Sequence, residues 1–254
     1  MKKKPNQSLL YANLVAAEIM KELEENFLKE GLMTIEINDF IDKKIREKNC
    51  IPGLLGYKGF PFSVCISINE ELCHGLPSKR ILMKGDIVKI DFVVERDGWI
   101  SDICKSFLIC DRNEYERKDL ISKRNLIHTA EECMRVGIER AGPGVNLKDI
   151  AIAVKNRAER DEFFVCGEFC GHGIERGNLH GSPKIVYDPE YYNNNKDIIL
   201  EEGKIITMEP IILEKKAKNV FLKDQWVYVS DVLSANHERT ILITSFGSVI
   251  LNDI

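Results

Sequence analysis

The spacing of apolar residues predicts two helices followed by three strands in the first part of the chain. Leu10, Leu14 and Ala17 recur at roughly helical intervals, and Gly31 suits the end of that helix. A second helical pattern follows Thr34. The predicted elements are helices over about 8–30 and 34–49, and strands over about 63–68, 86–95 and 99–109.

The same order of elements then recurs in the second part. Gly142-Pro143-Gly144 ends a long helical pattern, and Asn146 suits the cap of the next helix. The predicted elements here are helices over about 114–141 and 146–160, and strands around 163 and over about 204–213, 226–229 and 240–251.

A residue-by-residue match supports this duplication. Residues 82–91 and 200–209 carry a leucine, a glycine, an apolar pair and a terminal acid at the same offsets, the acids being Asp91 and Glu209. No linker composition separates the two parts. We therefore predict one catalytic domain over 1–254, with pseudo-twofold-related helix–helix–strand halves of about 6–112 and 113–254 and a site between them.

The strands around Asp97-Gly98 bring two carboxylates together. Asp-Gly between β-type residues is a strong signal for a two-residue hairpin loop. Counting outward from that loop places Asp91 opposite Cys104. Because side chains alternate along a strand, Asp91 and Asp102 then lie on one face as diagonal neighbours, roughly 7–8 Å apart at the backbone.

These acids are predicted to be metal ligands. Two carboxylates this close raise each other's pKa unless a cation lies between them. Glu209 occupies the matching position in the second half, Glu238 begins a later strand, and His172 adds an imidazole. Any one acid alone would be read as a solvated strand-edge residue. Four carboxylates and one histidine together suit two divalent ions, with Mn, Fe, Co and Zn all open.

Composition and charge narrow the function classes. The chain has 254 residues, of which 44% are hydrophobic, and a formal net charge of -4, which argues against an electrostatic nucleic-acid binder. We expect no membrane span, because no apolar run approaches the required length of roughly 18 residues. The eight cysteines are scattered, which suits reduced thiols in a cytoplasm. Phosphate-loop, nucleophile-elbow and dinucleotide fingerprints are absent from the sequence.

Several motifs resemble one known family over almost the whole chain. They are Leu55-Gly56-Tyr57-Lys58-Gly59-Phe60-Pro61, residues 63–70, Cys73-His74-Gly75-Leu76-Pro77, residues 85–91, Gly171-His172-Gly173-Ile174, Thr207-Met208-Glu209-Pro210 and residues 234–238. Together they resemble the type I methionine aminopeptidases, metallopeptidases of the M24 type. The resemblance implies an α+β pita-bread (creatinase/aminopeptidase) fold, in which the two halves surround a curved antiparallel sheet.

The resemblance also implies a role for each predicted ligand. Asp91 would bind one metal, and Asp102 and Glu238 would bridge both. His172 and Glu209 would hold the other metal. A water or hydroxide shared by the two metals would attack the scissile carbonyl, and Glu209 would be the proton carrier.

Substrate contacts follow from the same resemblance. His74 and His180 would be catalytic groups that touch the substrate peptide. The methionine side chain would lie among aromatic and sulfur-containing walls, which suit a thioether. The residues of this predicted pocket are Tyr57, Phe60, Cys65, Leu179 and Trp226. Each could instead be a core residue, and for Cys65 the two interpretations have equal weight.

The chain departs from the family pattern at several places. One extra residue precedes His180, which affects where His180 and Leu179 lie. His237 replaces an aromatic residue, and Arg239 replaces a histidine. No predicted metal ligand is lost, so we expect activity.

We predict a cytoplasmic, monomeric methionyl aminopeptidase that acts on the N-termini of nascent proteins near the ribosome exit. One alternative is another pita-bread peptidase, such as a proline-specific one, although those usually carry a sizeable extra N-terminal domain. The other alternative is a catalytically weak or silent relative that binds peptides or proteins.

Overall fold

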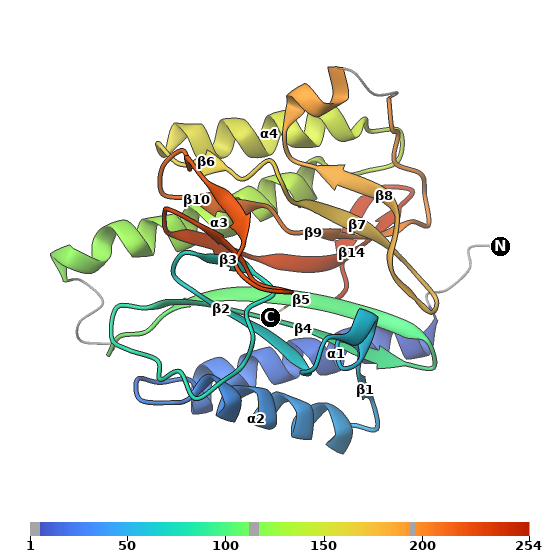
Figure 1. The fold of residues 1–254 in the computed structure, drawn as a ribbon. Coiled ribbons are helices and arrows are strands. Elements are labelled where there is room, and N and C mark those ends of the chain that lie inside the picture. Colours follow the sequence, from blue (N-terminus) through green and yellow to red (C-terminus); the bar gives the residue numbers. More distant parts are fainter. Residues whose placement is uncertain (1–5, 112–116, 194–196, 254) are drawn as a thin grey trace.

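The computed structural model describes residues 6–111, 117–193 and 197–253. Two pairs of helices pack on the outer side of a curved sheet (Figure 1). The helices are α1 (Gln7–Glu22), α2 (Thr34–Glu47), α3 (Ile121–Arg140) and α4 (Leu147–Arg160). Among the described residues, no helix is long and apolar enough to cross a membrane.

The large sheet joins strands from both halves of the chain. Its strands are antiparallel to their neighbours along one continuous path. In spatial order they are β1 (Ile51–Pro52), β4 (Ile87–Arg96), β5 (Trp99–Leu108), β14 (Glu238–Thr244), β9 (Ile205–Met208), β7 (Cys170–Glu175) and β8 (Asn178–Val186). Off this path, β2 (Val64–Ile68) pairs with β4 and β15 (Gly247–Ile250) pairs with β14.

Two small sheets complete the described strands. The first has the order β13 (Ser234–Asn236), β10 (Ile211–Leu213) and β6 (Phe164–Val165). The second has the order β11 (Val220–Leu222), β12 (Tyr228–Ser230) and β3 (Glu71–Cys73).

Each pair of helices covers its own part of the sheet. The apolar faces of α1 and α2 form one buried cluster with β2, β4 and β5, whereas α3 and α4 form a second cluster with β8, β9 and β14. In Figure 1, α1 and α2 lie below β4 and β5, whereas α3 and α4 lie in the upper part of the view, above β14. The Asn6 and Asn146 side chains accept backbone N–H bonds at the starts of α1 and α4, and such caps stabilise a helix by about 1 kcal/mol each. The predicted order of helix, helix and strands in each half is therefore present.

The predicted hairpin is confirmed. Arg96 pairs with Trp99 across the Asp97-Gly98 turn, and Asp91 lies opposite Cys104. Asp102 lies opposite Val93, which places it diagonally from Asp91.

Several predicted element boundaries were wrong. The first α-helix ends at Glu22 rather than near 30, because the chain widens into a π-turn in which the Leu28 N–H bonds Leu23 O. The long helix begins at Ile121, and its predicted start at 114 lies outside the described residues. The predicted boundary between the two halves, at 112/113, lies outside them too.

Two segments that were each predicted to be one strand contain two strands each. The strand over 204–213 divides into β9 and β10, because Pro210 has no N–H and the Glu209 N–H bonds the Tyr187 hydroxyl at 2.7 Å. The strand over 240–251 is the hairpin of β14 and β15. The hairpin of β7 and β8, which carries His172, was not predicted.

Candidate metal centre

Five consecutive strands of the large sheet each bring one of the predicted ligands to the same region. Asp91 lies on β4 and Asp102 on β5, both in the first half of the chain. Glu238 begins β14, Glu209 directly follows β9, and His172 lies on β7. Because the order of these strands is β4-β5-β14-β9-β7, residues far apart in sequence become neighbours.

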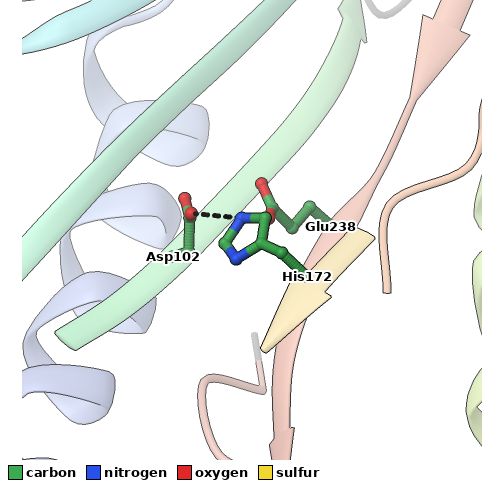
Figure 2. Close-up of side chains that lie close together, drawn as sticks. All are labelled: Asp102, His172 and Glu238. Carbon is green, nitrogen blue, oxygen red and sulfur yellow. Dashed lines mark ion pairs between the residues drawn. The ribbon is translucent and has the colours of Figure 1, made fainter. Parts of the chain in front are cut away.

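Three of these side chains meet closely. Asp102, His172 and Glu238 each offer one ligand atom, and the three atoms lie within 4.8 Å of one another. Figure 2 shows the three side chains converging from their separate strands. All three are buried, and His172 Nε2 lies 3.6 Å from Asp102 Oδ2. The sequence prediction therefore names a group that the fold does bring together.

Glu209 and Asp91 extend this group on either side. Glu209 Oε1 lies 3.5 Å from His172 Nε2. Asp91 lies opposite Cys104, which in turn lies opposite Glu238, so these three side chains share one face of the sheet. Asp91 lies on β4, which is one strand farther from β7 than β5, the strand of Asp102.

The electrostatics of the group fit a divalent cation. Burial raises the pKa of Asp91 and Glu238 well above the usual range, and neighbouring carboxylates add to this effect. Burial also raises the pKa of Glu209 to about 7. Burial alone lowers the pKa of His172, but Asp102 and Glu209 together raise it to about 9. A divalent ion would remove this mutual repulsion, and oxygen and imidazole donors suit Mn, Fe, Co or Zn.

Close backbone packing explains the glycines on either side of His172. A Cβ at Gly173 would lie 2.1 Å from Ser182 O, and one at Gly171 would lie 2.7 Å from Thr207 O. Side chains at these positions would push β7 away from its neighbours. The Gly-His-Gly sequence therefore lets the strand carry the imidazole deep into the sheet.

Sequence reasoning missed two hydroxyl groups that position the ligands. Thr207 Oγ1 accepts the His172 N–H at 2.9 Å and donates to Glu209 Oε1 at 2.5 Å. The Tyr187 hydroxyl accepts the Glu209 N–H. The match between residues 82–91 and 200–209 could have drawn attention to Thr207. It occupies the same offset as Lys89, and both polar side chains are buried.

His180 lies beside the predicted ligands in spite of the extra residue before it. Its ring centroid is 4.3 Å from that of His172, and its Nδ1 is 2.7 Å from the Tyr57 hydroxyl. Partial burial, and then the proximity of His172, lower the pKa of His180 to about 4. The ring is therefore neutral at physiological pH. Leu179, by contrast, packs in an apolar cluster with residues such as Ile174.

The remaining predicted contacts come from different parts of the chain. Phe60 and Trp226 pack edge to face, with ring centroids 5.3 Å apart and an interplanar angle of 86°. His74 has a positive φ of 56° and contacts the Tyr228 ring edge to face. Cys65 lies opposite Asp91 across β2 and β4. The methionine pocket stays a prediction, because these contacts do not join its members into one cavity.

Comparisons with known proteins agree with this fold. The model of metallopeptidase family M24 matches residues 7–245. Methionine aminopeptidase of Escherichia coli strain K12 is 36% identical over 252 residues, which are 96% of this chain and 90% of that protein. Methionine aminopeptidase of Buchnera aphidicola from Schizaphis graminum is 38% identical over 240 residues, which are 93% of this chain and 87% of that protein.

Solved structures give the same result. The crystal structure of methionine aminopeptidase from Rickettsia prowazekii superposes with a TM-score of 0.88 at 33% identity and covers 100% of both chains. Prolidase from Pyrococcus furiosus shares the fold, with a TM-score of 0.73 at 20% identity, and this chain covers 65% of it. The predicted pita-bread fold is confirmed. The chain belongs to metallopeptidase family M24 and, within it, to the methionine aminopeptidases.

Proposed function

We propose that this chain is a metal-dependent hydrolase that removes the N-terminal methionine from new proteins. The observation that carries the proposal is the buried group of Asp102, His172 and Glu238, whose ligand atoms lie within 4.8 Å of one another. Membership of a metallopeptidase family that includes methionine aminopeptidases supports the same activity.

We assign two divalent ions to the five predicted ligands. Asp91 would bind one ion and His172 the other. Asp102 and Glu238 would bridge them, and Glu209 would accompany His172. The order of the strands supports this assignment, because β5 and β14 lie between β4, which carries Asp91, and β7, which carries His172. Bound ions of this kind lower the pKa of water and polarise a peptide carbonyl.

Glu209 and His180 would act on the substrate. The Glu209 side chain is 21% exposed, compared with 7% for Asp102, so Glu209 is the carboxylate placed to exchange a proton with the reacting groups. The His180 Nδ1 is engaged by Tyr57, which fixes the ring and leaves Nε2 to contact a peptide. His74 would make a second contact with the peptide.

The methionine side chain would contact Tyr57, Phe60, Cys65, Leu179 and Trp226. The edge-to-face pair of Phe60 and Trp226 supports an aromatic wall for a thioether. We further propose that the chain works as a monomeric single domain over 1–254 in the cytoplasm, on peptide N-termini near the ribosome exit. Its eight cysteines, which form no disulfide in the described part of the chain, support a reducing compartment.

A peptide assay tests this function. Protein stripped of metal with a chelator is mixed with Met-Ala-Ser or Leu-Ala-Ser, and Mn, Co, Fe or Zn is added back. We expect release of methionine but little leucine, only with metal, and none from Asp102→Ala. Asp253→Ala, which removes an exposed carboxylate, is the matched control and should keep full activity. No release from folded protein with any metal would instead favour a silent relative that binds peptides.

A further inference from the structure

Two strands share one edge of β14, the strand that carries Glu238. Glu238 and Arg239 pair with Cys104 and Ile103 of β5. From Ile241 onward the same strand pairs with β15 instead, while its other edge pairs with β9. A fork therefore opens beside Thr240, between β5 and β15.

Asn252 fills this fork. It follows β15, and none of its surface is exposed. Its Oδ1 accepts the Thr240 N–H at 3.0 Å, and its Nδ2 donates to Asp102 O at 2.7 Å and to Ser101 Oγ at 3.1 Å. The amide group therefore joins β14 to β5 where direct backbone pairing has ended.

Both backbone groups of Asp102 depend on this arrangement. The Thr240 hydroxyl accepts the Asp102 N–H at 2.9 Å and donates to Asp102 O at 2.9 Å. Asp102 O receives its second bond from Asn252. The paired ladder between β5 and β14 is only two residues long, so these side chains hold Asp102 in register with Glu238.

We propose that Asn252 is a positioning residue for the metal centre. It touches no predicted ligand side chain in this role and acts through Thr240 and the Asp102 backbone. Without the Asn252 amide group, the buried Thr240 N–H loses its hydrogen-bond acceptor, and Asp102 O loses one of its two hydrogen-bond donors. Since unpaired buried groups are costly, the strands would shift to satisfy them, and the spacing of Asp102 and Glu238 would change. This inference rests on the proposed metal-dependent function.

Cobalt binding separates positioning from a purely structural role. Protein stripped of metal is titrated with Co²⁺ alone and followed by visible absorption, at a temperature where circular dichroism shows every variant folded. Asn252→Leu keeps the approximate volume but removes the hydrogen bonds, and Asn252→Asp keeps an acceptor but loses the donor. We expect both to bind Co²⁺ about 10- to 100-fold more weakly than wild type, as for other residues that orient metal ligands. Asp253→Ala, at the adjacent exposed position, should bind as wild type does.

The outcomes are distinct. If the Asn252 variants bind Co²⁺ as tightly as wild type and only their melting temperatures fall, Asn252 merely stabilises the fold and the proposal is overturned. If Asn252→Leu does not fold, Asn252→Ser, which is smaller and polar, carries the same test. Failure of wild type to bind Co²⁺ or release methionine would overturn the proposed function itself, whereas normal wild-type behaviour with unaffected variants would overturn only the role of Asn252.

Discussion

In the metal-free protein, the ionisation of Glu209 should lower the free energy of unfolding as the pH rises from about 5 to about 8. In the metal-free fold, burial raises the pKa of Glu209 from 4.5 to about 7, and the pKa values of Asp91 and Glu238 move in the same direction. Folding therefore favours the protonated acids. The stability that they contribute is fully present below the unfolded pKa and is lost as the pH rises through the folded one.

His172 changes stability in the same direction. Its pKa rises from 6.5 to about 9 because Asp102 and Glu209 outweigh the effect of burial. The favourable contribution of the charged imidazole is complete below pH 6.5 and is lost by about pH 9. The two ionisations share one ion pair, so their energies are not summed.

The magnitude follows from Glu209. The difference between 4.5 and about 7, at about 1.4 kcal/mol per pKa unit, corresponds to about 3 kcal/mol. A divalent ion would abolish this loss, because it stabilises the ionised carboxylates. Other groups act in the opposite direction: burial lowers the pKa of His180 to about 4, that of His237 to about 3 and that of Lys89 to about 7, so their contributions to stability rise with pH. Comparison with Glu209→Gln therefore isolates the contribution of Glu209.

Urea unfolding measures this dependence directly. Chelator-treated protein is unfolded at about pH 5.5, 6.5, 7.5 and 8.5, with and without Mn²⁺, and the free energy of unfolding is compared at each pH. Between about pH 5.5 and 8.5, the free energy of unfolding of the metal-free wild type should fall by about 2 kcal/mol relative to that of Glu209→Gln. A difference between wild type and Glu209→Gln that is constant over this interval, or that moves in favour of wild type as the pH rises, would refute the reasoning.

Three further predictions concern residues around the centre. Gly173→Ala should lower the free energy of urea unfolding by about 1–3 kcal/mol or prevent folding, because the added Cβ would clash with backbone atoms. Gly142→Ala is the control: its Cβ would have ordinary contacts, so the free energy of unfolding should change by less than about 0.5 kcal/mol. Tyr57→Phe should lower kcat/KM in the peptide assay about fivefold, because it removes the hydroxyl that bonds His180, a loss of about 1 kcal/mol. Glu238→Gln should weaken Co²⁺ binding yet raise the urea stability of the metal-free protein near pH 8, because it removes a buried charge.

The Asp91–Asp102 face could be predicted because one local signal fixed its register. Asp97-Gly98 sets the hairpin turn, and every later pair follows by counting outward. The positions of both carboxylates therefore follow from the local sequence, without information on residues far away along the chain.

The strand of His172 could not be predicted in this way. Gly171, Gly173 and Gly181 remove the alternation that identifies a strand, and their physical reason lies elsewhere in the sequence. Gly173 is small because Ser182 O lies against it, and Gly171 is small because Thr207 O does. These glycines are needed because neighbouring strands pack closely against them. In the sequence alone, glycines at such spacing resemble loop residues.

The role of Asn252 could not be predicted from the sequence either. Nothing in the residues next to Asn252 indicates its role, because its partners Thr240 and Asp102 lie 12 and 150 residues away. Asp102 belongs to the first half, whereas Glu238 belongs to the second, and their strands pair over only two residues. The proposed metal centre therefore requires that the two halves pack against each other. Side chains that close the seam between them, such as Asn252 and Thr240, control the metal site without being ligands.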